Sequence, residues 1–207
     1  ADTNTIESLT VEQAQKLVRE FPGVTARVKL KGHSERESQN GMPTILESPD
    51  SLPLNGLKKL DADVARALAE YQHWLLLNGL TTLDAETAKA LACLKGKLLV
   101  LNGLTTLDAE TAKGLAEFKG RSLLLHGLTT LNVETAKALS KSEVSLFLNG
   151  LTTLDAEAAK ALAKTKGWLS LIGLTTLDAE TAKALAECNR WDGDLQGLTA
   201  LEYPDSV

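Results

Sequence analysis

The sequence contains few of the residues that could cross-link a chain or hold it in a membrane. It has only two cysteines among 207 residues, which excludes a disulfide framework as the basis of the fold. The longest wholly apolar runs are about four residues, such as 98–101, so we expect no membrane span. The net charge is −5, and the lack of a basic surplus predicts that the chain has no nucleic-acid partner.

The N-terminal stretch lacks the apolar core of a signal sequence, and the chain begins with Ala1 and not with Met. These two features are typical of a mature or truncated chain, or of a cytosolic one. Of the possible cellular locations, we favour a secreted or periplasmic one over a cytoplasmic one.

What the sequence does contain is a repeat of 23 or 24 residues. The block Asn78–Ala92 returns at 102–116 with one change, Gly114 in place of Ala90, and returns with drift at 55–69, 126–140, 149–163 and 172–186. Glycines mark the period, at Gly56, Gly79, Gly103, Gly127, Gly150, Gly173 and Gly197. A fixed period in this range indicates a solenoid, in which each unit covers the core of its neighbour.

Each repeat combines two hydrophobic periods. Before the glycine, leucines alternate as in Leu75-x-Leu77, which predicts a short strand. After Leu83, residues such as Ala88 and Leu91 fall on one side of a helix that Asp84 caps. The cap position holds Asp61, Asp84, Asp108, Asn132, Asp155 and Asp178. The small residue at the Ala88 position lets the helix lie close to the strands, which favours a thin helical layer.

This pattern resembles the leucine-rich repeat family, in an irregular bacterial-type form, over about residues 50–200. The resemblance implies an α/β fold: a right-handed leucine-rich-repeat solenoid with short parallel strands on the concave face and short helices on the convex face. We expect about eight strands and seven helices. It also implies protein–protein recognition.

Two strand registers are open. In the first, Leu75 and Leu77 are the buried strand leucines, Asn78 faces out and the usual asparagine ladder is missing. In the second, Asn78 is the buried ladder residue, which would bury a polar column that includes His73, Lys97 and Arg121. We favour the first register because that column is too polar to bury.

The predicted organisation is one continuous solenoid domain. Residues 1–50 form an N-terminal cap, with a capped helix from Thr10, a strand at 28–32 and a polar loop at 33–50. Residues 51–191 form six repeats, and residues 192–207 close the C-terminal end. A degenerate unit at each end shields the core of a solenoid.

The residues that alternate outward on the strands are the candidate binding site. We expect them to form an exposed apolar patch on the concave face, of the kind that binds a protein partner or a second copy of the chain. The candidate residues are Trp74, Leu76, Leu98, Val100, Leu124, His126, Phe147, Trp168 and Ile172.

Other interpretations of the same surface remain open. A terminal loop could cover this face, or its apolar side chains could simply support one another. The chain could then be a structural or surface-displayed spacer. Threonine pairs recur at 81–82, 105–106, 129–130, 152–153 and 175–176, and a flat threonine array would suit ice binding, although local hydrogen bonding at tight corners explains them better.

No motif for catalysis or for cofactor binding occurs, so we expect a chain without catalytic residues, cofactor or metal site. The sequence has no Gly-x-Ser-x-Gly elbow, His-Glu-x-x-His motif or phosphate-binding glycine loop. Cys93 and Cys188 lie four repeats apart, too far for a disulfide. We expect both to be free thiols near helix ends, packed as small hydrophobic residues.

Overall fold

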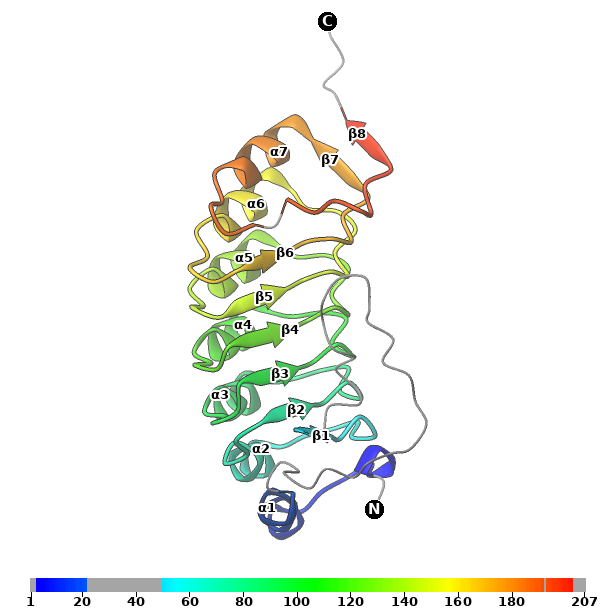
Figure 1. The fold of residues 1–207 in the computed structure, drawn as a ribbon, viewed down its shortest axis with the longest axis vertical. Coiled ribbons are helices and arrows are strands. Elements are labelled where there is room, and N and C mark those ends of the chain that lie inside the picture. The colour runs from blue at the N-terminus through cyan, green and yellow to red at the C-terminus, as the bar shows by residue number, and fades with distance from the viewer. Residues whose placement is uncertain (1–2, 22–49, 192, 203–207) are drawn as a thin grey trace, which may run out of the picture.

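In the computed structural model, which describes residues 3–21, 50–191 and 193–202, helices and strands alternate along an elongated stack (Figure 1). The described helices are a 3₁₀ turn η1 (Thr3–Thr5) and α1 (Val11–Glu20), α2 (Ala62–Leu68), α3 (Ala85–Ala92), α4 (Ala109–Ala116), α5 (Val133–Leu139), α6 (Ala156–Leu162) and α7 (Ala179–Ala186). Each of these α-helices packs against the next one in sequence. None of them is long and apolar enough to cross a membrane.

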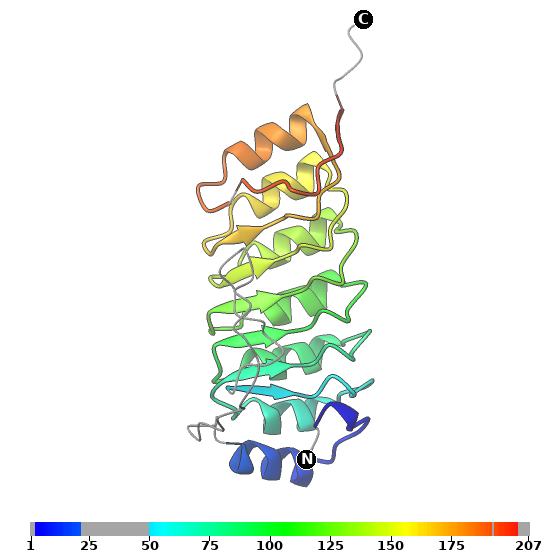
Figure 2. The ribbon, with the colours of Figure 1, turned by 45° about the vertical axis from the view of Figure 1, so that its right-hand side comes forward.

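The strands form a parallel sheet that follows the chain order, as a solenoid requires. Its members are β1 (Ser51–Pro53), β2 (Trp74–Leu76), β3 (Leu98–Val100), β4 (Ser122–Leu124), β5 (Ser145–Phe147) and β6 (Leu169–Ser170). The helices lie along one side of this sheet, as Figure 2 also shows. We call the face turned away from the helices the concave face. The predicted α/β solenoid is confirmed.

The main core lies between the sheet and the helices. Leu75 and Leu77 and their equivalents in the other repeats are fully buried there, together with helix residues such as Ala88 and Leu91. The first strand register is therefore confirmed for the leucines. Small alanines at the Ala88 position are fully buried in α2 to α6, which explains how the helices approach the sheet so closely.

Helix starts follow the predicted caps. In α3 the Asp84 carboxylate accepts the backbone N–H of Thr87 at 2.8 Å, and the equivalent bond exists in every helix from α2 to α7. In α1, Thr10 and Gln13 form the predicted capping box. These bonds satisfy N–H groups that a helix cannot pair internally.

Among the described residues, the C-terminal end of the stack differs from the prediction. The strand expected at 28–32 and the loop expected at 33–50 lie outside the described residues, apart from Asp50. At the other end, no seventh strand joins the sheet among the described residues, and Trp191 makes an isolated bridge to Leu169. The chain instead forms a separate parallel pair, β7 (Thr176–Asp178) with β8 (Ala200–Glu202).

Candidate functional site

The sheet register brings the predicted site residues onto adjacent strands. Trp74 lies opposite Leu98, and Leu76, Val100, Leu124 and Phe147 follow one another across β2 to β5. Because side chains alternate along a strand, these residues point away from the leucines of the main core. They form a second apolar cluster, separate from that core.

The exposure predicted for this cluster is wrong at four positions. Leu76, Val100 and Leu124 are at most 1% exposed, and Leu98 is also buried. Strand alternation indicates the direction of a side chain but not its exposure, so the sequence pattern could not show that these side chains are buried. Since the cluster is buried, the structure favours a covered or self-supporting face over an open apolar patch.

The accessible candidates lie around this cluster. Trp168, just before β6, is 46% exposed and is one of two large hydrophobic residues that are exposed among the described residues. Trp74, Phe147, Ile172 and His126 are half-buried. These five side chains are the candidate residues that keep solvent-accessible surface.

His126 is the most unusual of the candidate residues. Its ring lies edge-on to Phe147, with 6.4 Å between the ring centroids. Burial lowers the pKa of His126 below its usual value, and its buried Nε2 has no hydrogen-bond partner among the described residues. The neutral imidazole therefore behaves here as part of an apolar surface.

An asparagine ladder runs beside the cluster, which corrects our expectation that it is missing. The side-chain oxygen of Asn55 accepts the backbone N–H of Asn78, Asn78 accepts that of Asn102, and Asn102 accepts that of His126, all at 3.0–3.1 Å. These side chains are half-buried, so they bridge repeats at the end of the strands without displacing the strand leucines. The ladder stops at His126, and the buried side-chain oxygen of Asn149 has no hydrogen-bond partner in the part of the chain that the structure describes.

Two sets of threonines behave differently. The paired threonines are exposed from Thr81 to Thr153, and the last of them bond across repeats, with Thr175 donating its hydroxyl to the Thr152 carbonyl. A buried set that sequence reasoning missed lies one turn into the helices, at Thr87, Thr111, Thr135 and Thr181. Thr135 and Thr181 donate their hydroxyls to a carbonyl oxygen of the preceding repeat. The hydroxyls of Thr87 and Thr111 lie 3.5 and 3.3 Å from the equivalent carbonyl but donate to the carboxylate of their aspartate cap at 2.8 Å. The sequence signal for this buried set was the constant spacing of its threonines from the cap residue of each helix.

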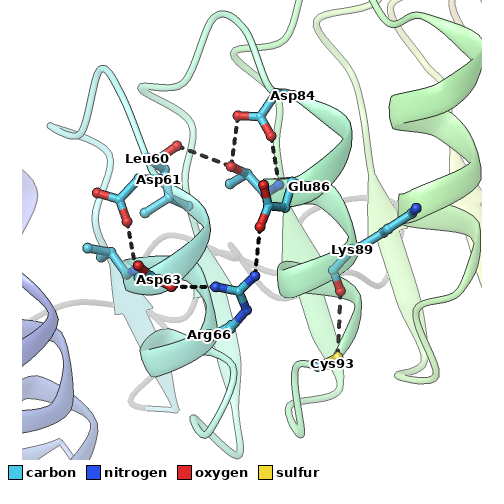
Figure 3. A network of polar contacts seen from close by, with 10 residues as sticks. Leu60, Asp61, Asp63, Arg66, Asp84, Glu86, Lys89 and Cys93 are labelled. Carbon is cyan, nitrogen blue, oxygen red and sulfur yellow. Dashed lines mark hydrogen bonds and ion pairs between the residues drawn. The ribbon is translucent and has the colours of Figure 1, made fainter.

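The convex face carries charged side chains in a regular network (Figure 3). Arg66 pairs with Asp63 on its own helix and with Glu86 on the next one, at 2.9 Å. Backbone and hydroxyl hydrogen bonds from Thr87 lower the pKa of Asp84. These groups are paired with each other or with helix N–H groups, so the network accounts for them structurally.

A groove lies between α1 and α2. It has a volume of 760 Å³ and is lined by Val11, Gln15, Val18, Arg19, Asp63, Arg66, Ala67 and Glu70. Its carboxylates are those of Asp63 and Glu70, and the described lining contains no serine, cysteine or histidine. Nor do three potential metal-ligating side chains meet anywhere in the part of the chain that the structure describes.

The cysteines are free, as predicted, but their surroundings differ. Cys188 is buried, whereas Cys93 is exposed at the C-terminal end of α3, where its thiol lies 3.6 Å from the Lys89 carbonyl oxygen (Figure 3). The prediction that both are packed as small hydrophobic residues is therefore wrong for Cys93. Its position follows the last buried helix residue and faces outward with the charged residues.

Sequence reasoning also missed a row of cations. The loops that connect each helix to the next strand carry Lys95, Lys97, Lys119, Arg121, Lys141, Lys164, Lys166 and Arg190, all exposed. The signal was the spacing of short basic pairs such as Lys95-Gly96-Lys97 between a predicted helix and a predicted strand. The solenoid places these loops along one edge (Figure 1).

Comparison with known proteins adds no assignment: the sequence matches no protein-family model and no curated protein.

Proposed function

We propose that this chain is a non-catalytic binding module of the leucine-rich-repeat type, and that it recognises a protein partner through the concave face. The observation that carries this proposal is the second apolar cluster, with Trp168 exposed beside it. A solenoid needs only one apolar sheet face to pack its helices. Apolar residues on the other face have no role in that packing, and exposed aromatic residues are typical anchors of protein interfaces.

The burial of four of these residues narrows the proposed contact surface. Leu76, Leu98, Val100 and Leu124 support the face from within, and the partner contacts the half-buried and exposed residues around them. Trp168 and Phe147 are the proposed anchors. His126 and Ile172 lie beside them on the same face and extend the surface, while Trp74 does so at the N-terminal side.

The substitution Trp168→Ser tests this proposal. Serine is the natural residue at the same strand position in β4 (Ser122) and β5 (Ser145), so the fold should tolerate it. We expect unchanged thermal unfolding, and loss of a partner that the unaltered protein captures from its native source. Capture of the same proteins by both forms would contradict the proposal.

Sedimentation velocity over a wide concentration range shows whether the partner is a second copy. If the chain self-associates through this face, the dimer is present in the unaltered protein and absent in the Trp168→Ser variant. A dimer that survives the substitution would place self-association elsewhere on the molecule.

A structural spacer is the second candidate function, favoured by the burial of Leu76, Val100 and Leu124. A spacer requires those residues only for stability, so its Trp168→Ser variant would lose neither partner nor stability. The capture experiment therefore separates the two candidates.

A further inference from the structure

The helix-to-strand edge of the solenoid is strongly basic although the whole chain is acidic. This edge, which we call the basic edge, comprises the loops 69–73, 93–97, 117–121, 140–144, 163–167 and 187–190. It carries the eight cations named above and four carboxylates, at Glu70, Glu117, Glu143 and Glu187. The edge thus has an excess of four positive charges on a chain whose net charge is −5.

Backbone hydrogen bonds hold the basic edge in register. The N–H of Arg121 donates to the Lys97 carbonyl at 2.7 Å, and the N–H of Ser145 donates to the Arg121 carbonyl at 3.0 Å. Lys97 and Arg121 are therefore neighbours on adjacent repeats. Strand spacing of about 4.8 Å sets the distance between successive members of this row.

Only part of this positive charge is neutralised within the molecule. Lys95 pairs with Glu70 at 2.5 Å, and Glu143 lies between Lys119 and Lys166, at 3.9 and 3.0 Å. The remaining cations of the edge have no ion-pair partner within the described residues. These are Lys97, Arg121, Lys141, Lys164 and Arg190.

Helix stability explains only some of these cations. Lys141 and Lys164 directly follow the ends of α5 and α6, where a cation interacts favourably with the helix dipole. Lys97 and Arg121 instead directly precede β3 and β4, and lie beyond the last turn of the helices before them. Their charge stabilises no helix end, which suggests that it serves an external anion.

An exposed aromatic residue completes the surface. Trp168 follows the loop that carries Lys164 and Lys166 and is 46% exposed. A partner that spans from Arg121 to Trp168 therefore meets both positive charge and an apolar ring. Such a combination suits an acidic polypeptide segment that also carries an apolar side chain.

A nucleic acid fits this surface less well. Single-stranded nucleic acid binds along grooves in which several aromatic rings stack on successive bases, and on this edge Trp168 is the one exposed aromatic ring among the described residues. Glu117 and Glu143 also interrupt the row, where a phosphate backbone would meet repulsion. A peptide can place its carboxylates opposite the free cations alone.

We propose that the basic edge, from Lys97 and Arg121 to Trp168, binds an acidic segment of a partner protein. This inference deepens the proposed function by naming the chemistry of the partner, and it rests on that function for the role of Trp168.

Fluorescence anisotropy with a labelled synthetic peptide tests the inference. The probe is a glutamate-rich peptide of about twelve residues with one central phenylalanine, compared with the same peptide in which glutamine replaces every glutamate. We expect the acidic probe to bind at low salt and to weaken as salt rises, because exposed charges are screened beyond about 10 Å at 0.1 M. The glutamine probe should not bind.

Charge reversal at the edge is compared with a matched reversal elsewhere. We expect Lys97→Glu/Arg121→Glu to weaken binding of the acidic probe about tenfold or more. The control, Lys89→Glu/Lys183→Glu, makes the same change in net charge at two exposed convex-face lysines outside the basic edge, and should change binding less than about threefold. Equal losses in both pairs would overturn the inference, as would equal binding of the glutamine probe.

Two further outcomes separate the hypotheses. Tighter binding of a single-stranded oligothymidylate than of the acidic probe would overturn the choice of a peptide. If the protein binds no acidic probe but Trp168→Ser still removes a captured partner, the charge inference fails and the proposed function stands. If the probe binds but Trp168→Ser removes no captured partner, the proposed function fails.

Discussion

Thr135 donates its hydroxyl to the carbonyl oxygen of Leu107, 3.0 Å away and across the boundary between two repeats. Its side chain is fully buried, so water cannot replace the bond. Thr87 and Thr111 make the same contact at 3.5 and 3.3 Å, and each is also 2.8 Å from the carboxylate of its aspartate cap. The contact is shortest where the cap is Asn132.

Replacement of this hydroxyl should destabilise the protein without unfolding it. We expect Thr135→Ala to lower the free energy of unfolding by about 1 kcal/mol, since the Leu107 carbonyl loses its donor. The fold should survive, because α6 carries Ala158 at the same position. Urea unfolding measures the difference, and Ala158→Thr is the matched reverse change. If the Thr135→Ala variant is as stable as the unaltered protein, the hydroxyl bond does not stabilise the stacking of the repeats.

The asparagine ladder provides a second stability test. Asn102→Ala should cost about 1–3 kcal/mol, because the backbone N–H of His126 loses its acceptor in a half-buried position. Asn149→Ala is the control, since the side-chain oxygen of Asn149 accepts no hydrogen bond from any described residue. We expect its cost to be smaller when both variants are compared by chemical unfolding. Equal costs would mean that side-chain packing, and not the ladder bond, sets the contribution of these residues.

The cap aspartates predict a loss of stability in acid. Hydrogen bonds, first of all those from the backbone N–H groups of Thr87 and Thr111, lower the pKa values of Asp84 and Asp108. Because the pKa is lower in the folded state, this stabilisation is complete above the unfolded-state pKa of about 3.9 and is lost as the pH falls through the folded-state pKa. Asp84→Asn/Asp108→Asn keeps an acceptor, as Asn132 does naturally, but removes the titration. Unfolding curves from about pH 7 to pH 2 should fall less steeply for this variant below pH 4. If the pH dependence of stability below pH 4 is unchanged in this variant, other groups cause the acid sensitivity.

Two glycines of the same repeat should differ in how much alanine destabilises the protein. A Cβ at Gly103 would overlap the carbonyl oxygens of Asn78 and Leu80, so Gly103→Ala should destabilise the protein by about 1–3 kcal/mol. Gly114 lies within α4, at a position that Ala90 and Ala138 fill in the adjacent repeats. A Cβ at Gly114 would lie 3.0 Å from the Ala88 Cβ and from the Lys89 backbone nitrogen, so α3 must shift slightly. A gain in helix propensity of up to about 1 kcal/mol opposes this cost, so Gly114→Ala should lower stability less than Gly103→Ala. Thermal unfolding of both variants decides, and a stabilising Gly103→Ala would contradict the close backbone contact.

The two thiols should react at very different rates. Cys93 is exposed and should react with a thiol reagent such as dithionitrobenzoate in the folded protein, whereas Cys188 is buried and should react only on unfolding. Absorbance should show one fast equivalent and one slow one, and Cys93→Ser should remove the fast phase. Rapid reaction of both thiols in the native state would show that the C-terminal end opens readily.

The local structure could be predicted from the sequence because the same strand and helix pattern recurs in each repeat. Alternating leucines before a glycine and an aspartate cap after it specify a strand and a helix, and the structure confirms both in the described repeats. The C-terminal strand was not predicted, since β8 pairs with β7 and not with β6. The pairing partner of β8 depends on which strand edge the chain can reach after Trp191. The period of the repeat carries no information about that partner.

By itself the sequence determined the repeat, its period, the strand leucines and the helix caps, because these depend on neighbours within about one repeat. Only the tertiary structure decided exposure. Leu76 and Trp168 both lie on outward strand positions, yet Leu76 is fully buried and Trp168 is not. The stacking of repeats likewise decided that Asn78 bonds to Asn102 and that the cations of separate loops share one edge. Burial and charge density are sums over residues that are far apart in sequence, so they become defined only when the repeats are stacked.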